Sequence, residues 1–290
     1  MLNRVRKVIF VMLFGLFVFI IGVILQLSYT QVQQWVYPQR TVVQPHPADS
    51  PFTKVTFQTE DDLTIYGWYA PSESGQVLLM FHGLGANRNQ LLIHAGYLLK
   101  AGYGILSIDF RNSGDSDGDV TSMGYYEIRD ARAAYQFLLE QDDVQQIVLM
   151  GHSMGGGIAS QLMEEVDADG LIIDATFADF PSIVRFGVVI RGFPPTPFTQ
   201  ILVTMASILS RSDWYSLRPI DQLASVDKPI LLMHGTDDLT VPIENAYRMV
   251  DANPQIKLVT FEGGGHGGLY NVDRDLYRNE VLDYLDHMLN

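Results

Sequence analysis

The chain has 290 residues, 47% of them hydrophobic, which is enough for one domain of α/β size with an appendage. Its 33 acidic and 19 basic residues give a formal net charge of -14. That balance argues against a nucleic-acid partner, because phosphate binding relies on clustered lysine and arginine. The absence of cysteine excludes a disulfide scaffold, a thiolate nucleophile and a cysteine-ligated metal.

A membrane anchor is predicted within residues 1–30. Residues 8–25 form an unbroken apolar run, close to the roughly 20 residues that a helix needs to cross a bilayer. A cleaved signal peptide has a shorter apolar core and a small-residue cleavage site, so an uncleaved anchor is favoured. Three basic residues precede the run and none follows it until Arg40. The positive-inside rule therefore predicts a single-pass protein with a cytoplasmic N-terminus and its main domain on the extracytoplasmic side.

Residues 31–52 are polar and contain four prolines, which predicts an extended tether between the membrane and the domain. In residues 53–290, short apolar runs alternate with amphipathic stretches, the pattern of a mostly parallel sheet with helices on both faces. The predicted strands are 55–58, 63–69, 77–81, 104–108, 146–150, 171–174, 230–234 and 257–261, the first two forming an antiparallel hairpin. The predicted helices are 89–101, 124–141, 155–165, 243–251 and 275–289.

An apolar, proline-broken stretch at about residues 181–211 interrupts this alternation of strands and helices. An insertion here is expected to form a small cap above the carboxyl ends of the strands, where ligands of open α/β sheets bind. Its apolar side chains either line a pocket for an acyl group or pack the cap against the sheet.

The pentapeptide Gly151-His152-Ser153-Met154-Gly155 follows an apolar strand and precedes a predicted helix, which indicates a nucleophile elbow. A serine on such a turn adopts strained backbone angles, and the flanking glycines remove Cβ atoms that would collide with the strand and the helix. Ser153 is therefore the predicted nucleophile.

A serine nucleophile needs a base, an acid that orients the base, and amide donors for the oxyanion. His266 lies in a glycine-rich loop after the last predicted strand, and Asp238 follows the preceding one. Asp174 is an alternative acid that ranks below Asp238. The backbone amides of Leu84, in the segment 82–85 after a central strand, and of Met154 are assigned to the oxyanion hole.

The chain at this point resembles the α/β-hydrolase superfamily, from about Thr53 to the C-terminus. The elbow and the segments Phe81-His82-Gly83-Leu84-Gly85, Asp109-Phe110-Arg111-Asn112-Ser113-Gly114-Asp115-Ser116 and His234-Gly235-Thr236-Asp237-Asp238 are similar to those of the group of monoacylglycerol lipases and serine aminopeptidases, above all its membrane-anchored members. The resemblance implies the α/β-hydrolase fold and an acid at the fifth residue of H-G-x-x-D, which selects Asp238 over Asp237. Where the group often has Arg-Gly, this chain has Arg111-Asn112.

The predicted function is a serine hydrolase that cleaves carboxylic esters, with lipophilic esters such as monoacylglycerols as the expected substrates. The alternatives are an aminopeptidase-like peptidase, an acyltransferase, and a membrane-tethered binding protein without turnover. No cofactor or metal is expected, because residues 115–119 lack the glycine position and the glutamate of a calcium loop. The oligomeric state stays open.

Overall fold

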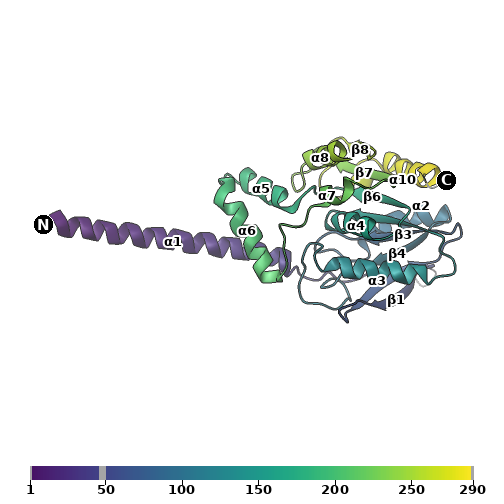
Figure 1. Cartoon of the computed structure of the whole chain (residues 1–290), viewed down its shortest axis with the longest axis horizontal. Coiled ribbons are helices and arrows are strands. Elements are labelled where there is room, and N and C mark those ends of the chain that lie inside the picture. Colours follow the sequence, from purple (N-terminus) through teal and green to yellow (C-terminus); the bar gives the residue numbers. More distant parts are fainter. Residues whose placement is uncertain (1, 46–49, 289–290) are drawn as a thin grey trace.

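The computed structural model describes residues 2–45 and 50–288; residues 46–49 of the predicted tether, and residues 1, 289 and 290, lie outside the described part. An eight-stranded sheet forms the centre of the domain, with all eight predicted strands present (Figure 1). The strands are β1 (Thr53–Gln58), β2 (Thr64–Ala70), β3 (Gln76–Phe81), β4 (Gly104–Ile108), β5 (Gln146–His152), β6 (Gly170–Asp174), β7 (Ile230–Gly235) and β8 (Lys257–Phe261), in the order β1-β2-β4-β3-β5-β6-β7-β8.

The sheet is parallel from β4 to β8, and β2 pairs antiparallel with both β1 and β4, which confirms the predicted hairpin. Successive side chains of the central strands enter opposite cores: Leu79 and Phe81 pack on one face, Leu78 and Met80 on the other. Both faces are therefore apolar and both are covered by helices, as predicted. The helices of the domain are η1 (Gln90–His94), α2 (Ala95–Lys100), α3 (Glu127–Leu139), α4 (Met154–Glu165), α5 (Phe180–Ile190), α6 (Pro195–Ser210), α7 (Pro219–Leu223), α8 (Glu244–Ala252), α9 (Leu269–Val272) and α10 (Arg274–Met288).

One predicted helix differs from the structure. Residues 89–101 form the 3₁₀ helix η1 followed by the short helix α2, instead of one continuous α-helix. Gly96 is the second residue of α2, where its low helix propensity weakens a continuous helix.

The predicted insertion consists of α5 and α6, which we call the cap. It begins six residues after Asp174, the last residue of β6, and so lies at the carboxyl edge of the sheet. Phe180 and the fully buried Trp214 pack edge to face at 4.7 Å between ring centroids, and Trp35 of the N-terminal helix contacts both rings. These aromatic contacts join the cap to the N-terminal helix and fix its position over the sheet edge.

The N-terminal helix α1 (Leu2–Val36) projects from the same edge of the domain (Figure 1). It is long and apolar enough to cross a membrane, and its residues 4–23 are exposed. The structure differs from the predicted extended tether at residues 31–36, which are helical because Val32 and Val36 are buried against the domain. Beyond the helix the chain follows the domain surface: the Arg40 guanidinium donates to the carbonyl oxygens of Ser116 and Gly118, and Asn87 donates to Thr41.

Candidate active site

Ser153 lies at the turn between β5 and α4 with φ 52° and ψ −116°, a conformation that L-residues rarely adopt. The expected strained elbow is therefore present, at an energetic cost of about 1–3 kcal/mol. A Cβ atom on Gly155 would overlap the carbonyl oxygen of Phe81, so glycine is required where α4 passes β3. The Ser153 amide donates to the Asp174 carbonyl at 2.8 Å, and the Thr176 hydroxyl donates to the Ser153 carbonyl at 2.7 Å. These contacts hold the strained turn in place.

The structure brings the three predicted catalytic residues together. His266 Nε2 lies 2.9 Å from Ser153 Oγ, and His266 Nδ1 lies 2.8 Å from Asp238 Oδ2. A carboxylate only accepts hydrogen bonds, so Nδ1 carries the proton and Nε2 is free to accept from the serine hydroxyl. Ser153, His266 and Asp238 thus have the connectivity that acyl transfer by serine requires.

The Asp238 carboxylate is fully buried, and its second oxygen accepts from the amides of Thr240 and Val241, both at 2.8 Å. The adjacent Asp237 is exposed. Asp174 is also buried but lies near His152, whose Nδ1 is 3.4 Å from Asp174 Oδ1. The geometry therefore places Asp238, rather than Asp237 or Asp174, next to His266.

The loops that carry His266 and Asp238 are joined through their backbones. The amide of Asp237 donates to the carbonyl of Gly264 at 2.9 Å, and the amide of Thr236 donates to that of Phe261 at 3.0 Å. A Cβ atom on Gly235 would overlap the Gly264 carbonyl oxygen. The glycines at 235 and 264 thus allow the two loops to pass close to each other. This close approach positions the His266 imidazole next to Ser153.

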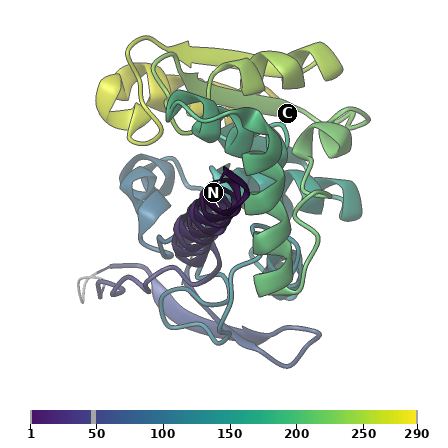
Figure 2. The ribbon, with the colours of Figure 1, turned by 90° about the vertical axis from the view of Figure 1, so that its left-hand side faces the viewer.

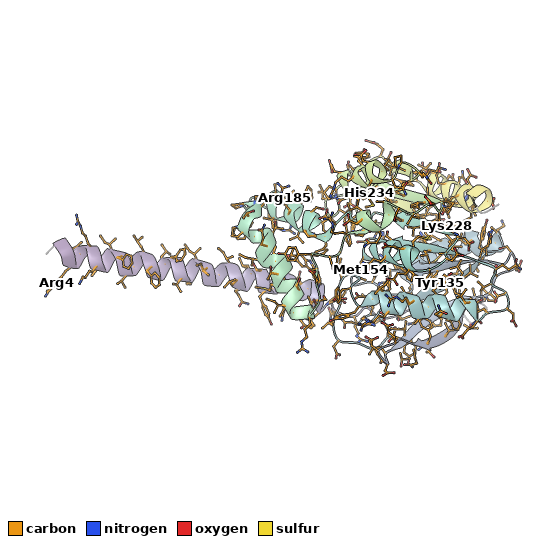
Figure 3. The ribbon with its side chains drawn as sticks, viewed as in Figure 1. Arg4, Tyr135, Met154, Arg185, Lys228 and His234 are labelled. Atoms are coloured by element: carbon orange, nitrogen blue, oxygen red, sulfur yellow. The ribbon has the colours of Figure 1, made fainter. Side chains whose placement is uncertain are left out.

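The segment after β3 lies against the elbow. Gly83 is so close to it that an added Cβ atom would be 3.5 Å from Ser153 Cβ and 3.1 Å from His152 Cδ2. The next residue, Leu84, supplies one of the two predicted oxyanion amides, and Met154, the first residue of α4, supplies the other. Met154 follows the serine directly in the chain, at the start of α4 (Figure 3), and Leu84 follows the glycine that packs against the serine. Their role stays a prediction.

Two cavities lie among the described residues: one of about 210 Å³ beside α4 and one of about 360 Å³ beside α6. Neither is lined by Ser153, His266 or Asp238. The pocket expected beneath the cap therefore stays a prediction. His266 is reached by solvent all the same, since a quarter of its side-chain surface is exposed.

His152, inside the elbow pentapeptide, belongs to a buried polar cluster that the sequence analysis missed. The His152 ring lies 5.4 Å from that of His266, and Asp174 accepts from the Tyr277 hydroxyl at 3.1 Å. Burial lowers the pKa of His152, but the Asp174 carboxylate outweighs burial and holds that pKa above its ordinary value. Burial alone would raise the pKa of Asp174, but the His152 imidazole outweighs burial, so the pKa of Asp174 lies below its ordinary value. Tyr277 comes from α10, over 100 residues away in the chain, so no local motif could have revealed it.

Replacing His94 by phenylalanine is expected to make the protein less sensitive to acid. His94 stacks on Tyr277 at 4.7 Å, and burial lowers its pKa to about 4. In the unfolded chain its pKa is about 6.5, so between pH 6.5 and pH 4 the unfolded state binds a proton that the folded state does not. Stability is unaffected above pH 6.5 and falls by about 3 kcal/mol as the pH drops to 4. His94→Phe should remove this loss.

The loss of stability is measured by urea unfolding of the full chain in detergent at pH 7, 5.5 and 4. The free energy of unfolding is compared between His94→Phe and wild type at each pH. Tyr97→Phe is the matched control, because it removes only the hydroxyl that lies 3.2 Å from His94 Nδ1. Parallel profiles for wild type and His94→Phe would contradict the expectation.

The chain is similar to known proteins both in sequence and in fold. A model of the alpha/beta hydrolase family matches residues 77–279, more than half of the chain and all three of Ser153, Asp238 and His266. YqkD of Bacillus subtilis (strain 168) is 28% identical over 227 residues, covering 76% of this chain and 74% of its own. YfhR of Escherichia coli (strain K12) is 26% identical over 303 residues, covering 99% and 97%. The structure of a Pyrococcus furiosus esterase is similar in fold, with a TM-score of 0.75, 23% identity, and coverage of 88% of this chain and 99% of the esterase.

Proposed function

The chain belongs to the alpha/beta hydrolase family, and from this membership we propose that it is a membrane-anchored serine hydrolase that cleaves lipophilic carboxylic esters. The observation that carries the proposal is the hydrogen-bonded chain from Ser153 through His266 to the buried Asp238 on a strained elbow. The binding-protein alternative gives no reason for a fully connected nucleophile, base and acid.

In the proposed mechanism, His266 Nε2 takes the proton of the Ser153 hydroxyl while Oγ attacks the ester carbonyl. The tetrahedral oxyanion accepts hydrogen bonds from the Leu84 and Met154 amides, and Asp238 stabilises the imidazolium. His266 then gives its proton to the leaving alcohol, which leaves an acyl group on Ser153. A water that His266 deprotonates attacks this acyl-enzyme and releases the carboxylic acid. An acyltransferase would differ only in using an alcohol in place of that water.

The composition of the cap favours an ester over a peptide. Residues 180–211 contain no aspartate or glutamate, so the cap offers no carboxylate for the free amine of an aminopeptidase substrate. Its side chains are mostly apolar, which suits an acyl chain. The P. furiosus neighbour is described as an esterase, which agrees with the preference, although that likeness shows the fold alone.

The purified full chain is expected to hydrolyse p-nitrophenyl esters or a monoacylglycerol at least ~100-fold faster, in kcat/KM, than aminoacyl-arylamides. The physical reason is that a cap without a carboxylate gives the amine no partner and so gains no binding energy from it in the transition state. Steady-state rates for an ester chain-length series and an arylamide series measure the ratio. Faster turnover of the arylamides would reject the ester assignment in favour of the peptidase alternative.

The membrane arrangement is part of the same proposal. Arg4, Arg6 and Lys7 precede the apolar run of α1, so the N-terminus is placed in the cytoplasm and the hydrolase domain outside it. Protease digestion of intact cells tests this, since the proposal requires that residues 53–290 be degraded without lysis.

A further inference from the structure

The free end of the cap is apolar and exposed. Val189, Ile190 and Phe193 expose 47%, 51% and 50% of their surfaces, and Phe193 contacts the ring of Phe198 at 5.2 Å between centroids. We call these four residues the cap tip. Single exposed apolar side chains are common on soluble proteins, but a contiguous group at one end of a helix pair marks an interaction surface.

The charge around the cap tip is opposite to that of the whole protein. Residues 180–211 carry three arginines and no acidic residue, in a chain whose net charge is -14. Arg185 is exposed on α5 (Figure 3), and Arg191 is exposed just after it. Neither makes an ion pair within the described residues; the Arg191 guanidinium donates only to the Gly187 carbonyl of its own helix, at 2.8 Å. Arginines without an ion-pair partner, next to exposed apolar side chains, can bind a surface that has both phosphate groups and hydrocarbon.

The orientation of α6 directs the cap tip toward the free half of α1. The C-terminal end of α6 lies at the base of α1, where the Tyr37 hydroxyl donates to the Leu209 carbonyl at 3.3 Å. Thr196, near the start of α6, is not helical; Pro197, which follows it, is 12 residues earlier than Leu209, about 18 Å along the helix axis. Figures 1 and 2 show α6 crossing beside α1, with the turn between α5 and α6 as the part of the domain nearest the exposed half of α1.

The contact face of α1 begins inside its apolar run. Ser28, Val32 and Val36 are buried at a spacing of four residues, and Ile24, one turn earlier, is half-buried. A hydrocarbon core of about 30 Å takes about 20 residues of helix, which from Val8 reaches Leu27. The domain therefore starts where the bilayer would end, and the cap tip lies at the level of its surface.

We propose that the cap tip docks into the surface of the bilayer that α1 crosses, with Arg185 and Arg191 on lipid phosphates, so that ester substrates pass from the membrane to Ser153 beneath the cap. Docking combines burial of the four apolar side chains with charge attraction, and α1 holds the tip at the surface at high effective concentration. The carboxyl edge of the sheet then faces the lipid. The passage of substrate rests on the proposed function; the docking itself does not.

Labelling tests the docking directly, because the chain has no cysteine of its own. Ile190→Cys and Phe193→Cys, each carrying the fluorophore NBD, are reconstituted as full chains in vesicles of phosphatidylcholine and phosphatidylglycerol. Both labels should emit at shorter wavelength than in water and be quenched by lipids that carry a nitroxide on the acyl chain. The control is Leu139→Cys: Leu139 is an exposed leucine at the end of α3, near the amino edge of the parallel strands.

Labels at 190 and 193 that behave like the label at 139, with quenching only by a water-soluble quencher, would overturn the proposal. A third outcome is that neither quencher reaches the labels and that the protein has twice the monomer mass in detergent. This outcome would overturn the proposal in favour of a contact between two copies of the chain.

Turnover tests the consequence for substrate. The double variant Ile190→Asp/Phe193→Asp should hydrolyse a long-chain ester embedded in the vesicles at least ~10-fold more slowly than wild type, yet keep its rate on a water-soluble short-chain ester within about twofold. Equal losses on both esters would overturn the passage of substrate through the docked cap. If wild type hydrolyses neither ester, the proposed function fails, and the quenching result still decides the docking.

Discussion

Ser153→Ala is expected to lower the rate of ester hydrolysis by about 10⁴- to 10⁶-fold, the largest effect of any single substitution in this chain. The hydroxyl 2.9 Å from His266 Nε2 is the only atom that the substitution removes, and alanine keeps the Cβ atom at the strained φ of 52°. The fold should therefore be unchanged. The residual rate would come from the oxyanion amides and substrate binding.

The measurement is kcat/KM on a water-soluble ester, together with labelling by a fluorophosphonate probe that modifies activated serines. Ser160→Ala is the matched control, since Ser160 is a buried serine on α4, the helix that follows Ser153, and its hydroxyl donates to the Gly156 carbonyl at 2.8 Å. The control should keep both activity and labelling. Undiminished labelling of Ser153→Ala would remove Ser153 from the mechanism and, with it, the proposed function.

Much of this fold was predictable because its signals are local. Each strand is a short apolar run of the right length, and the central ones, such as β3, are apolar on both faces because helices cover both. The elbow was predictable because the pentapeptide itself carries the signal: an added Cβ atom on Gly151 would overlap the Gly155 carbonyl oxygen, four residues later in the chain. Such signals survive in a single sequence.

What the sequence could not reveal depends on contacts between distant segments. The end of α1 contacts α6 of the cap, more than 150 residues later in the chain, and Val32 and Val36 are buried in the core of the domain. A polar, proline-containing stretch from residue 31 therefore predicted an extended chain, whereas tertiary packing extends the helix to Val36. The pairing of Asp174 with His152 and Tyr277 was likewise hidden, and with it the reason why a buried aspartate close to the elbow is not the partner of His266.

Asp238→Asn is the second substitution with a large expected effect, a loss of about 10⁴-fold in kcat with little change in stability. An amide can donate to His266 Nδ1, which would place the imidazole proton on Nε2, where it cannot accept the proton of Ser153. The amides of Thr240 and Val241 hold the side chain through its other oxygen in either case. Steady-state kinetics on a water-soluble ester, with a thermal melt to verify folding, measure the loss.

Two other aspartates, Asp237 and Asp174, serve as controls that show which aspartate orients His266. Asp237→Asn changes an exposed carboxyl group on the same loop and should leave kcat within a few-fold of wild type. Asp174→Asn removes the buried partner of His152 and Tyr277, so its expected cost is a lower melting temperature rather than a tautomer change at His266. If Asp174→Asn lost about 10⁴-fold and Asp238→Asn did not, the acid would be Asp174, and His266 would have to move away from the position at which its Nδ1 lies 2.8 Å from Asp238.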